Sequence, residues 1–187
     1  MGGTKKNGAE VLDSRVVYNN RGLIVKEEQF KVPGVTDTKT YRFCDMKSSI
    51  RIVAITEKNE VVLIEEFKYP VDEFVLSLPA GSVEEGEIPQ VAGERELKEE
   101  TGYTAKSFED LGSYYPMAGT IRQEAKVILA RNSYRCDSQN PDEYERVSIR
   151  KIELISLPNI FDAVKEDKLK DGQTLTALMM AISHLRH

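Results

Sequence analysis

The stretch from Gly81 to Tyr103 reads GSVEEGEIPQVAGERELKEETGY. Pro89 suits a first helical position, because an N–H at that position would have no partner within the helix. Gly102 suits the position just past a helix, where the chain often turns left-handed. Good helix formers fill the interval between them. The stretch therefore predicts a helix that begins at Pro89 and ends before Gly102.

Three carboxylates share one face of this predicted helix. At about 100° per residue, Glu96, Glu99 and Glu100 fall within an arc of roughly 100°. Like charges at this spacing destabilise a helix unless a cation offsets them. Because Mg²⁺ takes oxygen ligands and keeps substrate phosphates in its shell, the cluster predicts a divalent metal site. The alternative is a solvated acidic helix face without a ligand.

The wider spacing of the stretch matches a family signature. Gly81 is followed after five residues by Glu87, and seven further residues lead to RELKEETG at residues 95–102. This pattern is similar to the motif of the Nudix hydrolases. The family prefers an aliphatic residue where this chain has Tyr103, and that position is expected to pack rather than react. The resemblance implies an α/β fold, the Nudix α/β/α sandwich with a mixed sheet.

Composition narrows the class of protein. The chain has 187 residues, of which 40% are hydrophobic, and a net charge of −5 from 26 cations and 31 anions. A mildly acidic chain is a poor candidate for nonspecific nucleic-acid binding, and no apolar run is long enough to span a bilayer. Cys44 and Cys136 have no disulfide or metal-ligand spacing, which is typical of reduced thiols. We expect a cytoplasmic protein without nucleic-acid or membrane partners.

The pattern divides the chain into an N-terminal β annex at residues 1–46 and a main domain at residues 47–187. Three short antiparallel strands bury little surface alone, so the annex is expected to lean on the main domain or on a second subunit. The annex is expected to have strands at 14–18, 23–32 and 38–43.

Strands and helices alternate in the main domain in a way that suits an α/β sandwich. Residues 116–124 and 131–142 are expected to be loops, and Leu175, Leu178, Met179 and Ile182 give the last helix an apolar stripe. We expect strands at 50–56, 61–67, 75–78, 108–115, 125–130 and 147–157, and further helices at 158–165 and 174–185.

Flanking segments resemble the ADP-ribose and nucleoside-diphosphate-sugar pyrophosphatases within the Nudix family. They are FKYP at 67–70, LPAG at 78–81 and the annex, which in those enzymes helps to form a homodimer, often by exchange between subunits. Lys68 replaces the usual Arg, so a bidentate grip on phosphate becomes a point charge. Ser77 replaces a usual Glu. The resemblance implies metal-dependent hydrolysis of ADP-ribose or a related nucleoside diphosphate sugar to a nucleoside monophosphate and a sugar phosphate.

The resemblance also assigns the metal ligands. Glu96 and Glu100 are the expected ligands, with Glu99 sharing or bridging metals. The main-chain carbonyl of Ala80 completes the site, and the metal is Mg²⁺, with Mn²⁺ able to substitute. Arg95 and Glu99 are expected to serve catalysis, Arg95 by orienting and balancing charge at the i,i+4 spacing.

The general base and the substrate contacts lie outside the motif. Glu124 is the candidate base, because a mobile loop can bring a carboxylate to the attacking water; a solvated loop residue is the alternative. Lys68 and Arg122 are candidate phosphate contacts. The annex offers Tyr18, Arg21 and Phe30 as candidates to line a base pocket by stacking, with packing between strands as the alternative.

Two rival functions remain open. The first is a Nudix hydrolase of dinucleoside polyphosphates, oxidised nucleotides or capped RNA, against which the annex and LPAG argue. The second is a non-catalytic Nudix sensor of nucleotide sugars. The sensor is disfavoured because Glu96, Glu99 and Glu100 are all present and no basic DNA-binding segment is visible.

Overall fold

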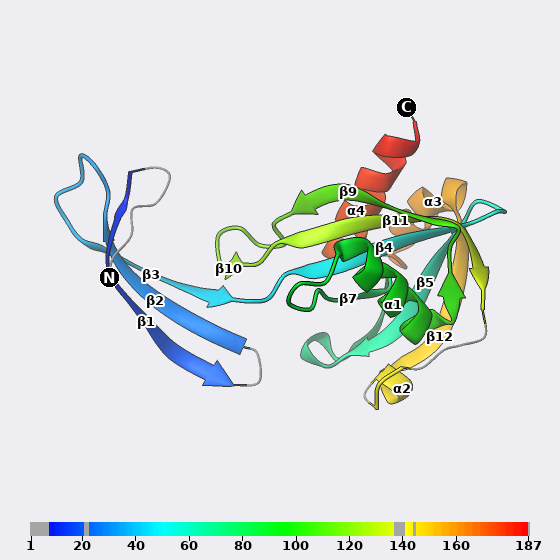
Figure 1. Ribbon diagram of the computed structural model, residues 1–187, viewed down its shortest axis with the longest axis horizontal. Helices are drawn as coiled ribbons and strands as arrows, with labels where there is room; N and C mark the ends of the chain where they lie inside the picture. Colours follow the sequence, from blue (N-terminus) through cyan, green and yellow to red (C-terminus); the bar gives the residue numbers. More distant parts are fainter. Residues whose placement is uncertain (1–7, 21–22, 137–140, 144, 187) are drawn as a thin grey trace. The chain divides into compact units, whose positions relative to one another are not determined.

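The computed structural model describes residues 8–20, 23–136, 141–143 and 145–186 (Figure 1). The chain forms two compact units. The first comprises residues 1–47 and 115–124, and the second comprises residues 48–114 and 125–187. None of the helices in the described ranges combines the length and the apolar character that crossing a membrane requires.

The first unit is a sheet with the strand order β1-β2-β3-β10. The strands β1 to β3 pair antiparallel, which confirms the three-stranded annex. The fourth strand, β10, contains two residues of a segment predicted as a loop and pairs in parallel with β3. A two-residue strand has no periodic pattern, and only its partner reveals it. The strands are β1 (Glu10–Asn20), β2 (Leu23–Lys31), β3 (Lys39–Asp45) and β10 (Ile121–Arg122).

The second unit is built on a mixed sheet with the order β12-β5-β4-β11-β8, to which β6, β7 and β9 add through β5, β4 and β11. The central pair β4 and β11 is parallel, and the other pairs are antiparallel. The strands are β4 (Ser49–Thr56), β5 (Glu60–Lys68), β6 (Glu73–Ser77), β7 (Ala80–Ser82), β8 (Tyr103–Thr104), β9 (Ser107–Tyr114), β11 (Ala125–Arg135) and β12 (Ile149–Ser156).

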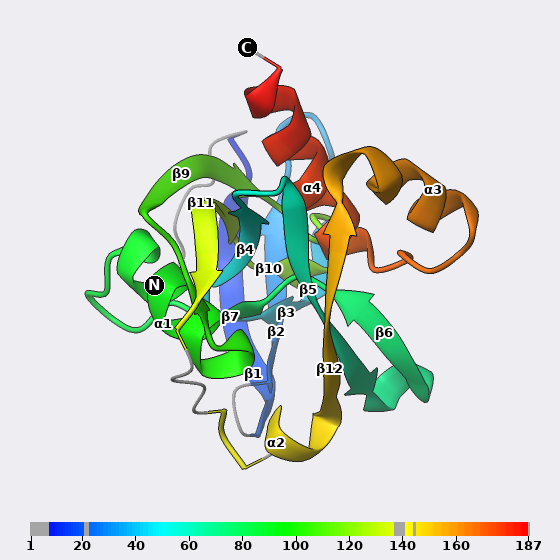
Figure 2. The ribbon, with the colours of Figure 1, turned by 90° about the vertical axis from the view of Figure 1, so that its right-hand side faces the viewer.

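Helices cover both faces of this sheet (Figure 2). One core cluster joins Ile52 and Val62 to Leu97 of α1, and the other joins Val53 and Leu63 to Leu178 of α4. Two buried faces confirm the α/β/α sandwich. The helices are α1 (Pro89–Thr101), α2 (Glu145–Ser148), α3 (Ile160–Lys165) and α4 (Gly172–Leu185), with 3₁₀ turns η1 (Tyr69–Val71) and η2 (Leu157–Asn159).

Three local predictions were wrong. Met179 is 55% exposed, so the apolar stripe of α4 is narrower than predicted. Strand β11 continues through the predicted loop to Arg135, because a register shift at Asn132, with φ of 52°, lets the chain go on to pair with β8. The short helix α2 overlaps the first two residues of the strand predicted at 147–157, which begins instead at Ile149 as β12.

Candidate functional site

Helix α1, which carries the acidic motif, packs closely against the sheet. It begins at Pro89 and ends at Thr101, and the Gly102 N–H donates to the Lys98 carbonyl at a φ of 70°, as predicted. Gly93 lies so close to the sheet that an added Cβ would be 3.2 Å from Cγ2 of Ile128. The carboxylates of α1 are therefore held at a defined height above the sheet.

Two of these carboxylates lie against the turn that leads into β7. Gly81 leaves room for Glu96, since a Cβ built on Gly81 would overlap the Glu96 carboxylate. Glu100 accepts a hydrogen bond from the Ala80 N–H at 3.0 Å. Both side chains are almost completely buried, with 8% of Glu96 and 5% of Glu100 exposed. The motif helix and the LPAG turn thus form one acidic site.

A third carboxylate comes from α2. One oxygen each of Glu96, Glu100 and Glu145 lie within 4.8 Å of one another. Glu145 was not among the residues predicted from the sequence. A signal for its helix was present, because Asp142 and Glu145 have the D-x-x-E spacing of a capping box. The Glu145 N–H donates to Asp142 Oδ1 at 2.7 Å, and the Asp142 N–H donates to Glu145 Oε2 at 2.8 Å.

Burial and neighbouring negative charge disfavour the ionised forms of Glu96 and Glu100. Burial raises the pKa of Glu96, against the hydrogen bond from Arg95. Burial also raises the pKa of Glu100 well above its usual value, and the charges of Glu145, Glu96 and Glu66 raise it further. Such a site gains free energy when it takes up protons or a cation.

Arg95 is a cation beside the site that binds three acidic side chains. Its Nε and one terminal nitrogen bind the two carboxylate oxygens of Glu87 at 3.2 Å each. Its other terminal nitrogen donates to Glu96 at 2.8 Å and to Glu99 at 3.2 Å, so the predicted i,i+4 contact with Glu99 is present. Glu99 is 37% exposed at its side chain and does not belong to the group of three carboxylates.

Lys68 lies on the same face of the sheet as α1. Val62 packs in the cluster under α1, and side chains alternate along β5, which places Glu66 and Lys68 on that face. Lys68 Nζ is 2.5 Å from Glu66 Oε2. Because the charge of Glu66 contributes to the raised pKa of Glu100, Lys68 adds positive charge near the acidic site.

The remaining predicted residues belong to the first unit. Arg122 donates from Nε to Asp45 Oδ1 at 2.8 Å and from a terminal nitrogen to Asp45 Oδ2 at 2.5 Å. Its guanidinium carbon also lies 4.9 Å from the ring centroid of Phe43. Glu124 is exposed at the end of the segment that belongs to this unit.

The two annex aromatics that were predicted to contact substrate are only partly covered. Tyr18 is about half exposed, and its hydroxyl accepts a hydrogen bond from the Asn20 amide at 3.4 Å. Phe30 is half-buried on β2. Arg21 lies outside the described residues.

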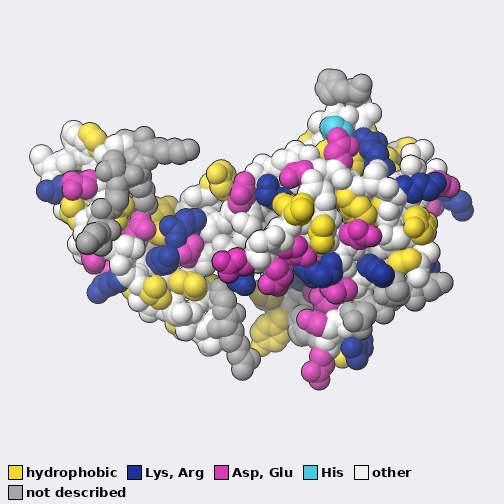
Figure 3. Space-filling model, viewed as in Figure 1, with side chains coloured by type: hydrophobic (Ala, Val, Ile, Leu, Met, Phe, Trp, Pro, Cys, Tyr) yellow, Lys and Arg dark blue, Asp and Glu magenta, His cyan; other side chains and the backbone are white. Residues whose placement is uncertain are grey.

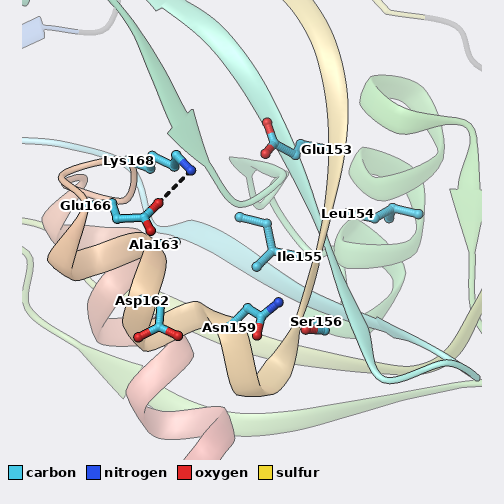
Figure 4. Close-up of a pocket in the computed structure, with 9 residues that line it drawn as sticks. All are labelled: Glu153, Leu154, Ile155, Ser156, Asn159, Asp162, Ala163, Glu166 and Lys168. Atoms are coloured by element: carbon cyan, nitrogen blue, oxygen red, sulfur yellow. Dashed lines mark hydrogen bonds and ion pairs between the residues drawn. The ribbon is translucent and has the colours of Figure 1, made fainter.

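A pocket of about 400 Å³ lies between β12 and α3 and contains none of the predicted residues (Figure 4). Its acidic lining is offset by lysines, because Glu166 pairs with Lys168 at 2.6 Å and Glu153 pairs with Lys151 at 2.9 Å. The carboxylates of Glu153 and Glu166 are therefore ion-pair partners and are more exposed than Glu96 and Glu100.

Comparisons with known proteins support one family. The sequence matches the NUDIX domain over residues 46–173. It is 32% identical over 170 residues to a methanol dehydrogenase activator of Bacillus methanolicus, covering 90% of each chain. It is 28% identical over 131 residues to an ADP-ribose pyrophosphatase of Bacillus subtilis, covering 70% of this chain and 69% of the relative. A crystal structure described as an ADP compounds hydrolase matches the fold with a TM-score of 0.83 at 20% identity, over 98% of this chain and 96% of that one.

Proposed function

This chain belongs to the NUDIX domain family, and from that premise we propose that it hydrolyses the diphosphate bond of ADP-ribose or a related nucleoside diphosphate sugar. The products are a nucleoside monophosphate and a sugar phosphate. The observation that carries this proposal is the buried group of Glu96, Glu100 and Glu145 at the LPAG turn. The relatives named as ADP-ribose and ADP-sugar pyrophosphatases support the substrate class.

A divalent cation fits the carboxylates on α1 and α2. Their oxygens are close enough for one ion to reach all three. Burial and neighbouring carboxylates raise the pKa of Glu96 and Glu100, so a bound cation would favour their ionised forms. We assign Glu96, Glu100 and Glu145 as carboxylate ligands, with the Ala80 carbonyl beside them and Mg²⁺ or Mn²⁺ as the ion. When bound, the ion stabilises charge on the phosphoryl oxygens and lowers the pKa of water.

The other side chains take supporting parts in this proposal. Arg95 holds Glu96 and Glu99 in place and balances their charge. Lys68 is a phosphate contact that can leave Glu66 when the anionic substrate arrives. In the first unit, Glu124 stays the candidate base, and Arg122, Tyr18, Arg21 and Phe30 stay candidate substrate contacts. The protein acts as a homodimer in the cytoplasm.

The direct test is hydrolysis of ADP-ribose with and without Mg²⁺. We expect AMP and ribose phosphate as the products by mass spectrometry, and no turnover in excess chelator. Turnover that persists in chelator would remove the metal from the proposal. Dinucleoside polyphosphates, oxidised nucleotides and capped RNA belong in the same assay, because a strong preference for one of them would favour the rival hydrolase function.

The base is tested by two matched substitutions. Glu124→Gln should lower kcat at an unchanged affinity for Mn²⁺, because the proposed base does not bind the metal. Glu145→Gln should weaken Mn²⁺ binding, because it removes a ligand charge. An unchanged kcat in Glu124→Gln would exclude Glu124 as the base and leave the metal site untouched.

A second candidate function is activation of a dehydrogenase. The methanol dehydrogenase activator is similar over 90% of this chain, a share that must include most of the N-terminal annex as well as the Nudix domain. The test is to add this protein to the methanol dehydrogenase of Bacillus methanolicus and to measure methanol oxidation. Stimulation that disappears in Glu100→Gln would connect activation to the same acidic site.

A further inference from the structure

We infer that Thr174, on the C-terminal helix, is a positioning residue for the turn that carries Ala80, an inference that rests on the proposed function. Thr174 Oγ1 accepts a hydrogen bond from the Leu78 N–H at 3.0 Å. The contact is completely enclosed, with Thr174 0% and Leu78 1% exposed. The hydroxyl comes from α4, which packs in the core cluster on the face of the sheet opposite α1.

The Leu78 N–H has no strand partner, because β6 ends at Ser77 and β7 begins at Ala80. A buried N–H without a partner is costly, so the chain must supply an acceptor from another element. Thr174 supplies it. The hydroxyl therefore determines where the backbone turns between two strands of the sheet.

The turn is held at three points from three elements. Thr174 holds the Leu78 N–H, the Ile52 N–H on β4 donates to the Pro79 carbonyl at 2.9 Å, and the Ala80 N–H donates to Glu100 on α1 at 3.0 Å. Two of these bonds act on the peptide group that joins Pro79 to Ala80. Loss of the Thr174 bond would leave the turn held only at this peptide group, so the Ala80 carbonyl that follows it would be less firmly positioned.

Thr174 is itself fixed in place. It lies in the first turn of α4, where its N–H donates to the Asp171 side chain at 2.8 Å. Further along the helix, Ala177, Leu178 and Ala181 are buried in the core. The hydroxyl is thus held in place by a well-packed helix. Its hydrogen bond to the Leu78 N–H connects the position of α4 to the position of the turn that carries Ala80.

The test compares Thr174→Val with Thr174→Ser and Thr176→Val. Valine keeps the shape but removes the acceptor, whereas serine keeps it. Thr176 is the control, since its hydroxyl donates to the Gly172 carbonyl within α4 and is exposed. We expect Mn²⁺ binding, measured by calorimetry, to weaken roughly three- to tenfold in Thr174→Val, the range that one lost buried hydrogen bond gives. Thr174→Ser and Thr176→Val should bind Mn²⁺ as the wild type does.

Kinetics and amide exchange complete the test. In Thr174→Val, kcat for ADP-ribose should fall while KM stays within about twofold of the wild type, because the turn holds the metal rather than the sugar. The inference would be overturned if Thr174→Val bound Mn²⁺ with wild-type affinity, or if the serine and valine variants lost affinity equally. Either result would leave the proposed function standing. Absence of Mn²⁺ binding by the wild type would overturn the proposed function and the inference together. If Thr174→Val does not fold, fast hydrogen exchange at the wild-type Leu78 amide would still refute the hydrogen bond.

Discussion

At Gly81, the absence of a side chain leaves the space that the Glu96 carboxylate occupies. We expect Gly81→Ala to weaken Mn²⁺ binding roughly 10- to 100-fold, as displacement of groups around a metal commonly does. The overlapping atoms are the far end of a flexible side chain, so Glu96 can swing away at little cost in stability. Calorimetry and thermal unfolding measure the two effects separately.

Gly172→Ala is the matched control for this prediction. The space around Gly172 is open, with no atom within 4 Å of an added Cβ. Its Mn²⁺ affinity should equal that of the wild type. Unchanged binding in Gly81→Ala would show that Glu96 can leave its position without loss of the metal, and would remove Glu96 from the ligand set.

Glu100 is expected to support activity but to lower the stability of the metal-free protein. Its pKa in the folded protein is raised above the usual 4.5. The folded protein therefore binds this proton more tightly than the unfolded chain, and stability falls as the pH rises from 4.5 through the raised pKa. Glu100→Gln removes this titration. In metal-free buffer the variant should gain stability over the wild type as the pH rises above 4.5, measured by urea unfolding.

The same substitution should lower kcat for ADP-ribose by orders of magnitude, because a neutral amide is a poor ligand for a divalent ion. Glu94→Gln is the control, since Glu94 is an exposed carboxylate on the same helix. It should keep the wild-type kcat. Near-normal activity of Glu100→Gln would exclude Glu100 as a ligand, and a stability difference independent of pH would contradict the raised pKa.

At the scale of elements, β10 depends on the side chain of Arg122 as well as on its own backbone. The hydrogen bonds from Arg122, together with Lys26, lower the pKa of Asp45 to about 2. Because the folded pKa is below the usual 3.8, this pair stabilises the protein above pH 3.8, and the effect is lost as the pH falls towards 2. Arg122 thus joins β10 to β3, on which Asp45 is the last residue.

We expect Arg122→Gln to loosen the pairing of β10 with β3. The Cys44 N–H donates to the Thr120 carbonyl and the Met46 N–H donates to the Arg122 carbonyl, so these two amides should exchange several-fold faster (about the effect of one weakened ion pair). Hydrogen exchange by NMR measures this. A raised KM for ADP-ribose at unchanged exchange would instead assign Arg122 to the phosphate.

At the scale of the whole molecule, the annex exposes several large apolar side chains. Val16 is 53% exposed, and hydrophobic side chains are visible on the surface of this unit in Figure 3. These side chains lie on two paired strands, β1 and β2, and apolar surface gathered in this way commonly marks an interface. The exposed apolar residues of β1 and β2 are Leu12, Val16, Val17, Tyr18 and Leu23.

We therefore expect a homodimer with twice the chain mass of 21.1 kDa, measured by light scattering during gel filtration. Val16→Glu should shift the mass towards that of the monomer, because a charge buried in an interface is costly. Met179→Glu places the same charge on an exposed apolar residue of the other unit and should remain dimeric. A monomeric wild type, or equal effects of the two substitutions, would contradict an interface on the annex.

Local sequence was sufficient for much of this protein. Pro89 and Gly102 act on the backbone of their own helix, so the bounds of α1 followed from residue types alone. The strands expected at 50–56, 61–67 and 108–115 likewise match β4, β5 and β9 to within one residue at each end. The acidic face of α1 followed from the geometry of one helix, and the Nudix family followed from its motif.

The parts of the fold and of the site that were not predicted from the sequence depend on long-range contacts. Glu145 joins Glu96 and Glu100 only because distant segments meet around the sheet, and the spacing of α1 contains no information about α2. The bond from Thr174 to Leu78 and the pairing of β10 with β3 are likewise made between residues far apart in the chain. The sequence pattern within one helix or strand specifies which face of that element a side chain occupies. Which residues it contacts from other elements depends on how all the elements pack.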